Sequence, residues 1–149
     1  MRFDFKNAAI RHFNDGELLY AHSRWANADQ LYGLSSECVL KHIIARLDPD
    51  SVDPITGDFL RVSRHKKHFD NQDPARDLWK YFSNLFVEQL AELARSGCVM
   101  PNENGFRNWD IFQRYAHGSC IDQQHTDPHR SATIELQGLL DWSFAARGV

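Results

Sequence analysis

Four side chains late in the sequence are of the types that bind zinc. They lie within thirteen residues and are His117, Cys120, His125 and His129. Zinc prefers histidine nitrogen and cysteine sulfur, and Asp122 or Asp127 could complete or replace a ligand. The order H-x2-C-x4-H-x3-H does not correspond to a zinc motif of known spacing. The alternative is a polar loop followed by the first turn of a helix.

Two arginine–histidine pairs could support cleavage of RNA without a metal ion. This reaction needs a general base at the 2′-hydroxyl, a general acid for the leaving 5′-oxygen and a cation for the phosphorane charge. Histidine can transfer protons in either role near neutral pH, and the planar arginine guanidinium binds phosphate. The candidate pairs are Arg114 with His117 and Arg61 with His68.

Each pair also has a structural interpretation. Arg114 could form a salt bridge near the core, with Trp109 and Tyr115 packed around it. Arg61 and His68 could simply belong to a solvated basic loop. Both interpretations stay open at this point, because the sequence does not show which side chains meet.

The most basic run of the chain extends from residue 61 to residue 68 and includes Arg64, Lys66 and Lys67. These three cations could contact the phosphates of a nucleic acid, which would make binding salt-dependent without sequence specificity. Solvation alone also explains a charged run in a loop. The formal net charge is −3, so a nucleic-acid site has to be a local patch.

The motifs of the common enzyme classes are missing. There is no Walker A loop, GxGxxG, GxSxG, HExxH or CxxC, and we expect no cofactor. The three cysteines are widely spaced, which favours a reducing compartment over a disulfide scaffold. The N-terminus does not resemble a signal peptide, and no window approaches the roughly 20 apolar residues of a membrane span. We therefore expect a cytoplasmic protein.

Hydrophobic periodicity predicts four long helices, near residues 5–22, 24–46, 74–96 and 128–147. The second has the clearest pattern, and its apolar residues cover more than one face, so we expect neighbours on more than one side. Its small residues would let another backbone approach closely. Glu37 and Lys41 on this helix have the spacing of an i,i+4 ion pair.

The predicted helix starts and connections rest on local signals. Asp73-Pro74 and Asp127-Pro128 predict helix starts, because aspartate caps a helix and proline fits its first turn. Residues 48–72 form a long connection. In a second connection, over 101–126, the segment 109–115 could be a short helix or extended.

The predicted elements indicate an all-α bundle, with no alternating strand pattern. The 149 residues suit one domain over 1–149 with a substantial core. Hydrophobic residues make up 42% and charged residues 25%, as in ordinary globular proteins.

The first two predicted helices resemble the opening of HEPN-superfamily domains. The similar stretches are Arg11-His-Phe-Asn-Asp-Gly-Glu-Leu-Leu and Arg24-Trp-Ala-Asn-Ala-Asp-Gln-Leu-Tyr-Gly-Leu-Ser-Ser-Glu-Cys-Val-Leu-Lys41. They follow the family patterns H-x2-D-A-x2-L and A-x2-L-x-G-x-A-x-E-x2-L-K, with Gly16 and Ser35 where alanine is usual. The resemblance implies a four- or five-helix bundle that is frequently a homodimer.

The HEPN resemblance also implies two classes of function. One is a metal-independent endoribonuclease of a toxin–antitoxin or phage-defence system, and the other is a non-catalytic module that binds a nucleotide, RNA or a protein partner. HEPN nucleases carry R-x4-6-H. Here no histidine follows Arg107 within reach, Arg114 and His117 are closer than the motif, and Arg61 and His68 have its spacing but lie in a predicted loop.

Overall fold

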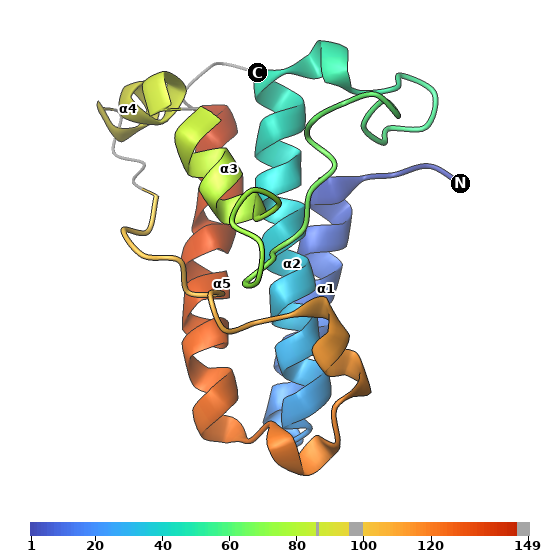
Figure 1. The fold of residues 1–149 in the computed structure, drawn as a ribbon, viewed down its shortest axis with the longest axis vertical. Coiled ribbons are helices and arrows are strands. Elements are labelled where there is room, and N and C mark those ends of the chain that lie inside the picture. Colours follow the sequence, from blue (N-terminus) through green and yellow to red (C-terminus); the bar gives the residue numbers. More distant parts are fainter. Residues whose placement is uncertain (86, 96–99, 146–149) are drawn as a thin grey trace.

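The computed structural model describes residues 1–85, 87–95 and 100–145, and these residues form an all-α fold (Figure 1). Its α-helices are α1 (Phe5–Ala21), α2 (Trp25–Leu47), α3 (Leu78–Leu85), α4 (Val87–Arg95) and α5 (Gln123–Ala145). Short 3-10 helices lie in the connections: η1 (Pro49–Ser51), η2 (Ile111–Tyr115) and η3 (Gly118–Cys120). Within the described ranges, β structure is limited to two isolated bridges, so the all-α prediction is confirmed. No helix in these ranges is long and apolar enough to cross a membrane.

The helices α1 and α2 form an antiparallel pair beside each other in Figure 1. Their bounds agree with the predicted helices at 5–22 and 24–46 to within one residue at each end. Small side chains let the two backbones approach, as predicted. The hydroxyl of Ser35 on α2 donates to the carbonyl of Ala9 on α1 at 2.7 Å, and both residues are fully buried.

The helix α5 runs parallel to α2 and completes the bundle. The hydroxyl of Ser36 on α2 donates to that of Thr133 on α5 at 3.1 Å, and the Thr133 hydroxyl donates to the carbonyl of Tyr32 at 3.2 Å. Leu136 and Leu140 of α5 are buried in the core, as their spacing predicts. Because α2 packs against both α1 and α5, the expectation of neighbours on more than one side is confirmed.

The predicted start of the last helix at Pro128 is wrong, because α5 begins at Gln123 and Pro128 lies inside it. Asp122 caps the helix instead, accepting the backbone N–H of His125 at 2.8 Å. The carboxylate of Asp127, the expected cap, accepts the hydroxyl of Tyr20 at 2.6 Å. Proline removes one helical hydrogen bond, and here the cap and the packing against α2 outweigh that loss. The predicted end near residue 147 lies outside the described residues.

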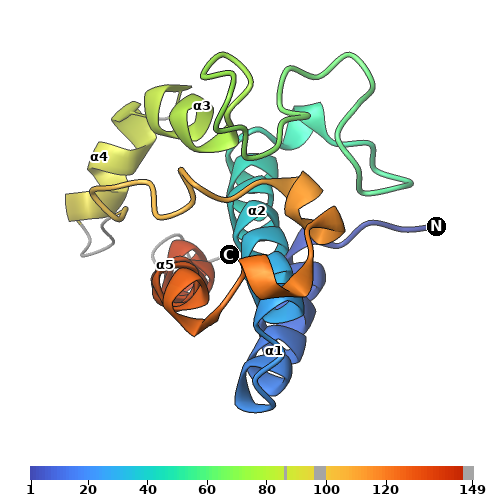
Figure 2. The same ribbon diagram turned by 60° about the horizontal axis from the view of Figure 1, so that its bottom comes forward.

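The helix predicted at 74–96 corresponds to α3 and α4, which lie on either side of residue 86 (Figures 1 and 2). It also begins later than predicted, at Leu78. Asp73 and Pro74 form a turn in which the N–H of Asp77 donates to the carbonyl of Asp73. Asp77 then caps α3 by accepting the N–H of Lys80 at 2.9 Å. Residues 86 and 96 lie outside the described residues.

The two long connections supply aromatic side chains to the core. Figure 2 shows the segment between α4 and α5 crossing over α2 before α5 begins. Trp109 on this segment is fully buried against Gly33, where an added Cβ would lie 1.9 Å from the indole. Phe106 stacks on Phe69 of the other connection, with ring centroids 4.9 Å apart. The segment 109–115, for which the sequence allowed either a short helix or an extended strand of chain, contains the 3-10 helix η2.

Candidate functional site

The predicted pair Arg114 and His117 lies on the surface. Arg114 is exposed, and its guanidinium lies over the ring of Tyr115, 4.8 Å from the centroid. His117 is also exposed, with Nδ1 2.7 Å from the hydroxyl of Ser119. Among the described residues, Arg114 belongs to none of the ion pairs, so the alternative of a salt bridge near the core is wrong.

In the second predicted pair, a buried carboxylate anchors His68. Its Nδ1 lies 2.8 Å from Oε2 of Glu37 on α2; the Glu37 side chain is 3% exposed and that of His68 is 67% exposed. Glu37 also accepts the backbone N–H of Phe69 at 3.0 Å and binds Lys41 at 3.4 Å, which confirms the predicted i,i+4 pair. A carboxylate at Nδ1 selects the tautomer with the proton there, which leaves Nε2 of His68 for a ligand.

His68 lines a surface cleft of about 510 Å³, a volume typical of small-molecule sites. The cations Lys66, Lys67 and Arg76 line it from the first connection. Phe112 of η2 lines it from the second connection, and this residue is 65% exposed. The cleft therefore joins a basic loop to an accessible aromatic ring, although the two segments are far apart in sequence.

The cleft contains only part of the predicted basic patch. The predicted residues Arg61 and Arg64 are exposed but do not line the cleft, whereas Arg76, which sequence reasoning missed, does. Arg76 lies beyond the basic run, next to the start of α3. Its proximity to the run follows from the turn at Asp73 and the cap at Asp77, neither of which the charge pattern reveals.

Two carboxylates in the cleft already accept hydrogen bonds. Asp70 accepts the backbone N–H groups of Gln72 and Asp73 at 3.0 and 2.9 Å, and these bonds lower the pKa of its carboxyl. Asp110 accepts the N–H of Phe112 at 2.7 Å. Each therefore stabilises the local loop conformation, and part of its negative charge is compensated by backbone dipoles.

Two of the three cations of the cleft have weakly held carboxylate partners, whereas Lys67 donates to the carbonyl of Ala75 at 3.2 Å and lies over the ring of Tyr81. Lys66 pairs with Asp58 at 2.9 Å and Arg76 with Asp73 at 3.4 Å, and all four side chains are at least 28% exposed. Exposed pairs of this kind contribute about 0–1 kcal/mol each. Lys66 and Arg76 can therefore turn toward an anionic ligand at small cost.

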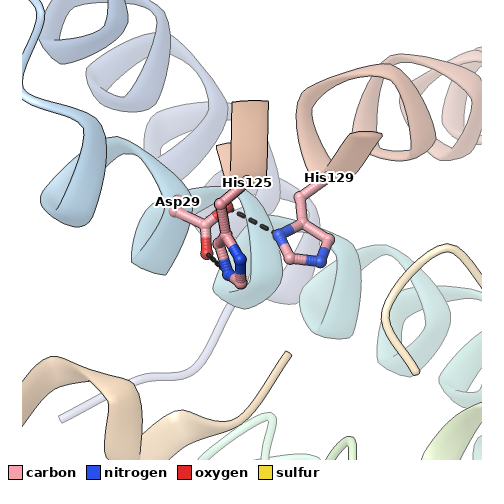
Figure 3. Close-up of side chains that lie close together, drawn as sticks. All are labelled: Asp29, His125 and His129. Carbon is pink, nitrogen blue, oxygen red and sulfur yellow. Dashed lines mark hydrogen bonds and ion pairs between the residues drawn. The ribbon is translucent and has the colours of Figure 1, made fainter. Parts of the chain in front are cut away.

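A second cluster lies between α2 and α5, where Asp29 faces His125 and His129 (Figure 3). The two histidines are four residues apart on α5 and so share one face of the helix. Nδ1 of His129 lies 2.6 Å from Oδ1 of Asp29, and Nε2 of His125 lies 3.8 Å from Oδ2. One ligand atom from each residue lies within 4.8 Å of the other two, so the three residues could hold a metal ion.

Polar side chains of the second connection hold this cluster in place. Nε2 of His129 lies 2.9 Å from Oδ1 of Asn108, and Gln113 donates from its amide to Oδ2 of Asp29. The indole N–H of Trp109 donates to the carbonyl of Asp29 at 3.0 Å. Asp29 and His129 are both 0% exposed, so this network replaces the water that their polar atoms lose.

The structure brings together only two of the four predicted zinc ligands, His125 and His129. His117 and Cys120 are exposed, and Asp122 and Asp127 are engaged as a helix cap and as the acceptor of Tyr20. The third member is Asp29, which the sequence analysis missed because it is nearly one hundred residues away. A charged residue on an otherwise apolar helix face was the only signal that could have marked it.

Comparison of the chain with protein-family models, curated protein sequences and solved structures finds no match. The side chains of the cleft and of the buried cluster therefore carry the functional argument.

Proposed function

We propose that this chain binds single-stranded RNA in the cleft between the basic loop and η2. The observation that carries the proposal is the grouping of Lys66, Lys67 and Arg76 with the exposed ring of Phe112 around one hollow. Cations neutralise phosphates, and an accessible aromatic ring stacks on a base, which are the two parts of a sequence-tolerant single-strand site. The resemblance to HEPN domains points to the same class of ligand.

The cleft is lined by more cations than carboxylates, although the whole chain is acidic. At −3, the whole molecule does not attract nucleic acid, but the cleft concentrates three cations. Its two carboxylates are directed at backbone N–H groups of their own loops. The cleft is thus the local patch that RNA binding by an acidic protein requires.

Binding can be tested by fluorescence anisotropy with a labelled single-stranded RNA at several salt concentrations. Phe112→Ala removes the stacking surface, so we expect binding weaker by roughly 5- to 100-fold. Arg76→Ala removes a phosphate contact. It should reduce the slope of log binding constant against log salt concentration by about one. The matched controls are Tyr115→Ala and Arg61→Ala, which remove exposed side chains outside the cleft. Equal losses in the controls, or no salt-dependent binding by the wild type, would refute the proposal.

A second candidate function, RNA cleavage, is supported by the contact between Glu37 and His68. Nε2 of His68 would accept the proton of the 2′-hydroxyl, and the 2′-oxygen would attack phosphorus. The 5′-oxygen would leave and take a proton from water, giving a cyclic phosphate. Lys66 and Arg76 would stabilise the phosphorane charge.

Cleavage is measured with a defined RNA in the presence of EDTA, scoring cyclic-phosphate ends. We expect His68→Gln to lower the rate by at least about 100-fold while RNA binding changes little. Arg114→Ala with His117→Ala serves as the control for the other predicted pair. If that double variant loses cleavage and His68→Gln does not, the site lies near η3. If the wild type leaves RNA intact, the cleavage proposal is refuted, and the binding proposal is decided by the anisotropy measurement.

The HEPN resemblance adds the proposal of a homodimer in which two copies of the site act together. Light scattering of the purified chain measures its mass directly. A dimer that dissociates at high salt would be expected if basic loops lie near the interface. A monomer at every concentration would mean that each cleft acts alone.

A further inference from the structure

Asp29, His125 and His129 do not line the proposed RNA cleft and form a different kind of site. We infer that these three residues bind a divalent transition-metal ion of the Zn²⁺ class. Two imidazoles and a carboxylate are a common three-residue ligand set for zinc, which leaves a fourth position for water. The ligand atoms of a tetrahedral zinc site lie about 3.3 Å apart. Here Nδ1 of His129 lies 2.6 Å from Oδ1 of Asp29, Nε2 of His125 lies 3.8 Å from Oδ2, and one ligand atom of each residue lies within 4.8 Å of the other two.

The hydrogen bonds of His129 accommodate a cation at this point. Nε2 of His129 lies 2.9 Å from Oδ1 of Asn108, and Nδ1 lies 2.6 Å from Oδ1 of Asp29. When Nε2 donates to Asn108, either a second proton or a metal ion lies between Nδ1 and the carboxylate. With a metal ion at Nδ1, Asn108 has the position of an outer residue that orients a metal-bound histidine.

His125 supplies an independent observation. Its Nε2 is buried and has no hydrogen-bond partner, although it lies on the side of the ring that faces Asp29 (Figure 3). A buried nitrogen left without a partner costs about 1–3 kcal/mol unless a ligand occupies its lone pair. The His125 side chain is also 30% exposed, so an ion could enter from the solvent on this side.

Asp29 is oriented for the same role. Gln113 donates to one oxygen of its carboxylate, and Trp109 donates to its backbone carbonyl. The ring of Phe106 stacks on His129 at 5.5 Å and holds the imidazole plane. Asp29 and His129 therefore have fixed directions before an ion binds, which favours affinity.

The test uses the full chain, stripped with a chelator and then dialysed against Zn²⁺ or Co²⁺. We expect about one ion per chain by elemental analysis, and a tetrahedral Co²⁺ absorption band in the visible range. His125→Gln should abolish both signals, and Asn108→Ala should weaken binding about 10- to 100-fold. His125 is the residue to change because it is partly exposed, so the variant keeps the buried pair and should fold.

His117→Gln and Cys120→Ser are the matched controls, since they change exposed residues of the same segment and should retain the ion. The inference is overturned if the wild type binds no ion, or if His125→Gln still binds one. It is also overturned if nitrogen NMR shows both ring nitrogens of His129 protonated in the presence of Zn²⁺, because a proton would then occupy the place of the metal.

Discussion

The helix α2 carries two acidic side chains that each hold a histidine from a distant segment, in contrasting surroundings. Asp29 and His129 are both 0% exposed, and other side chains meet their remaining polar atoms. Glu37 is equally buried, but its partner His68 is 67% exposed at the edge of a cleft. The closed pair thus has its geometry determined by the protein, whereas the open pair leaves one ring nitrogen for a ligand. Exposure of the histidine, rather than the identity of the pair, separates the two roles.

The largest difference in stability between the two pairs should appear when the carboxylate of Asp29 or that of Glu37 is removed. Asp29→Ala leaves the buried His129 and the partly buried Gln113 amide without their partner, so we expect a loss of about 3–5 kcal/mol in unfolding free energy. Glu37→Ala should cost less, about 1–3 kcal/mol, because water can reach His68 while the N–H of Phe69 loses its acceptor. Urea denaturation measures both, with Asp50→Ala as a surface control. Equal losses for the two carboxylates would contradict the comparison.

A glycine tests how closely the closed pair is packed. Gly33→Ala places a Cβ 1.9 Å from the indole of Trp109, which must move. We expect a loss of about 1–3 kcal/mol and a red shift of the tryptophan emission, because the indole also bonds to the carbonyl of Asp29. Gly138→Ala on α5 is the control: no atom lies within 4 Å of its added Cβ, and it should raise stability by up to about 1 kcal/mol. A neutral Gly33→Ala variant would mean that the indole has room to shift.

A third histidine, His42 on α2, adds a smaller, pH-dependent effect. Burial, with Arg46 and Lys6 nearby, lowers its pKa to about 4 from an ordinary value of 6.5. The unfolded chain therefore takes up a proton at His42 as the pH falls below 6.5, and the folded chain does so only near pH 4. Stability from this residue is fully present above pH 6.5 and decreases between pH 6.5 and 4, by about 1–2 kcal/mol after allowance for partial exposure.

The effect of His42 can be isolated with His42→Gln, which should flatten the dependence of the urea midpoint on pH over that interval. His22→Gln, at an exposed histidine, should leave the slope unchanged. If His42→Gln and the wild type show the same slope, other groups determine how stability decreases between pH 6.5 and 4.

The sequence predicts best the two helices whose apolar residues recur at helical spacing along their whole length, α1 and α2. The bounds of α1 and α2 agree with the prediction, because apolar residues at steps of three and four define a face wherever the helix packs. The Asp-Pro signals failed at both later helices. Asp77 and Asp122 cap those helices instead, since a cap depends on which side chain the surrounding loop leaves available.

The sites could be predicted only in part. The local sequence pattern predicted Lys66, Lys67 and His68 for contact with RNA. It also predicted His125 and His129 as candidate metal ligands. It missed their partners, since Arg76 and Phe112 reach the cleft through two separate connections, and Asp29 and Glu37 project from a helix that the pattern assigned to the core.

Sequence alone determined the all-α fold, the helices α1 and α2 and the residue types able to do chemistry, because each depends on neighbours a few positions away. Only the tertiary structure decided which of them meet. Asp29 and His129 come together because α5 packs parallel to α2. His68 acquires its carboxylate because a loop folds back onto α2. Contacts between distant segments follow from packing of the whole chain, which no local periodicity encodes.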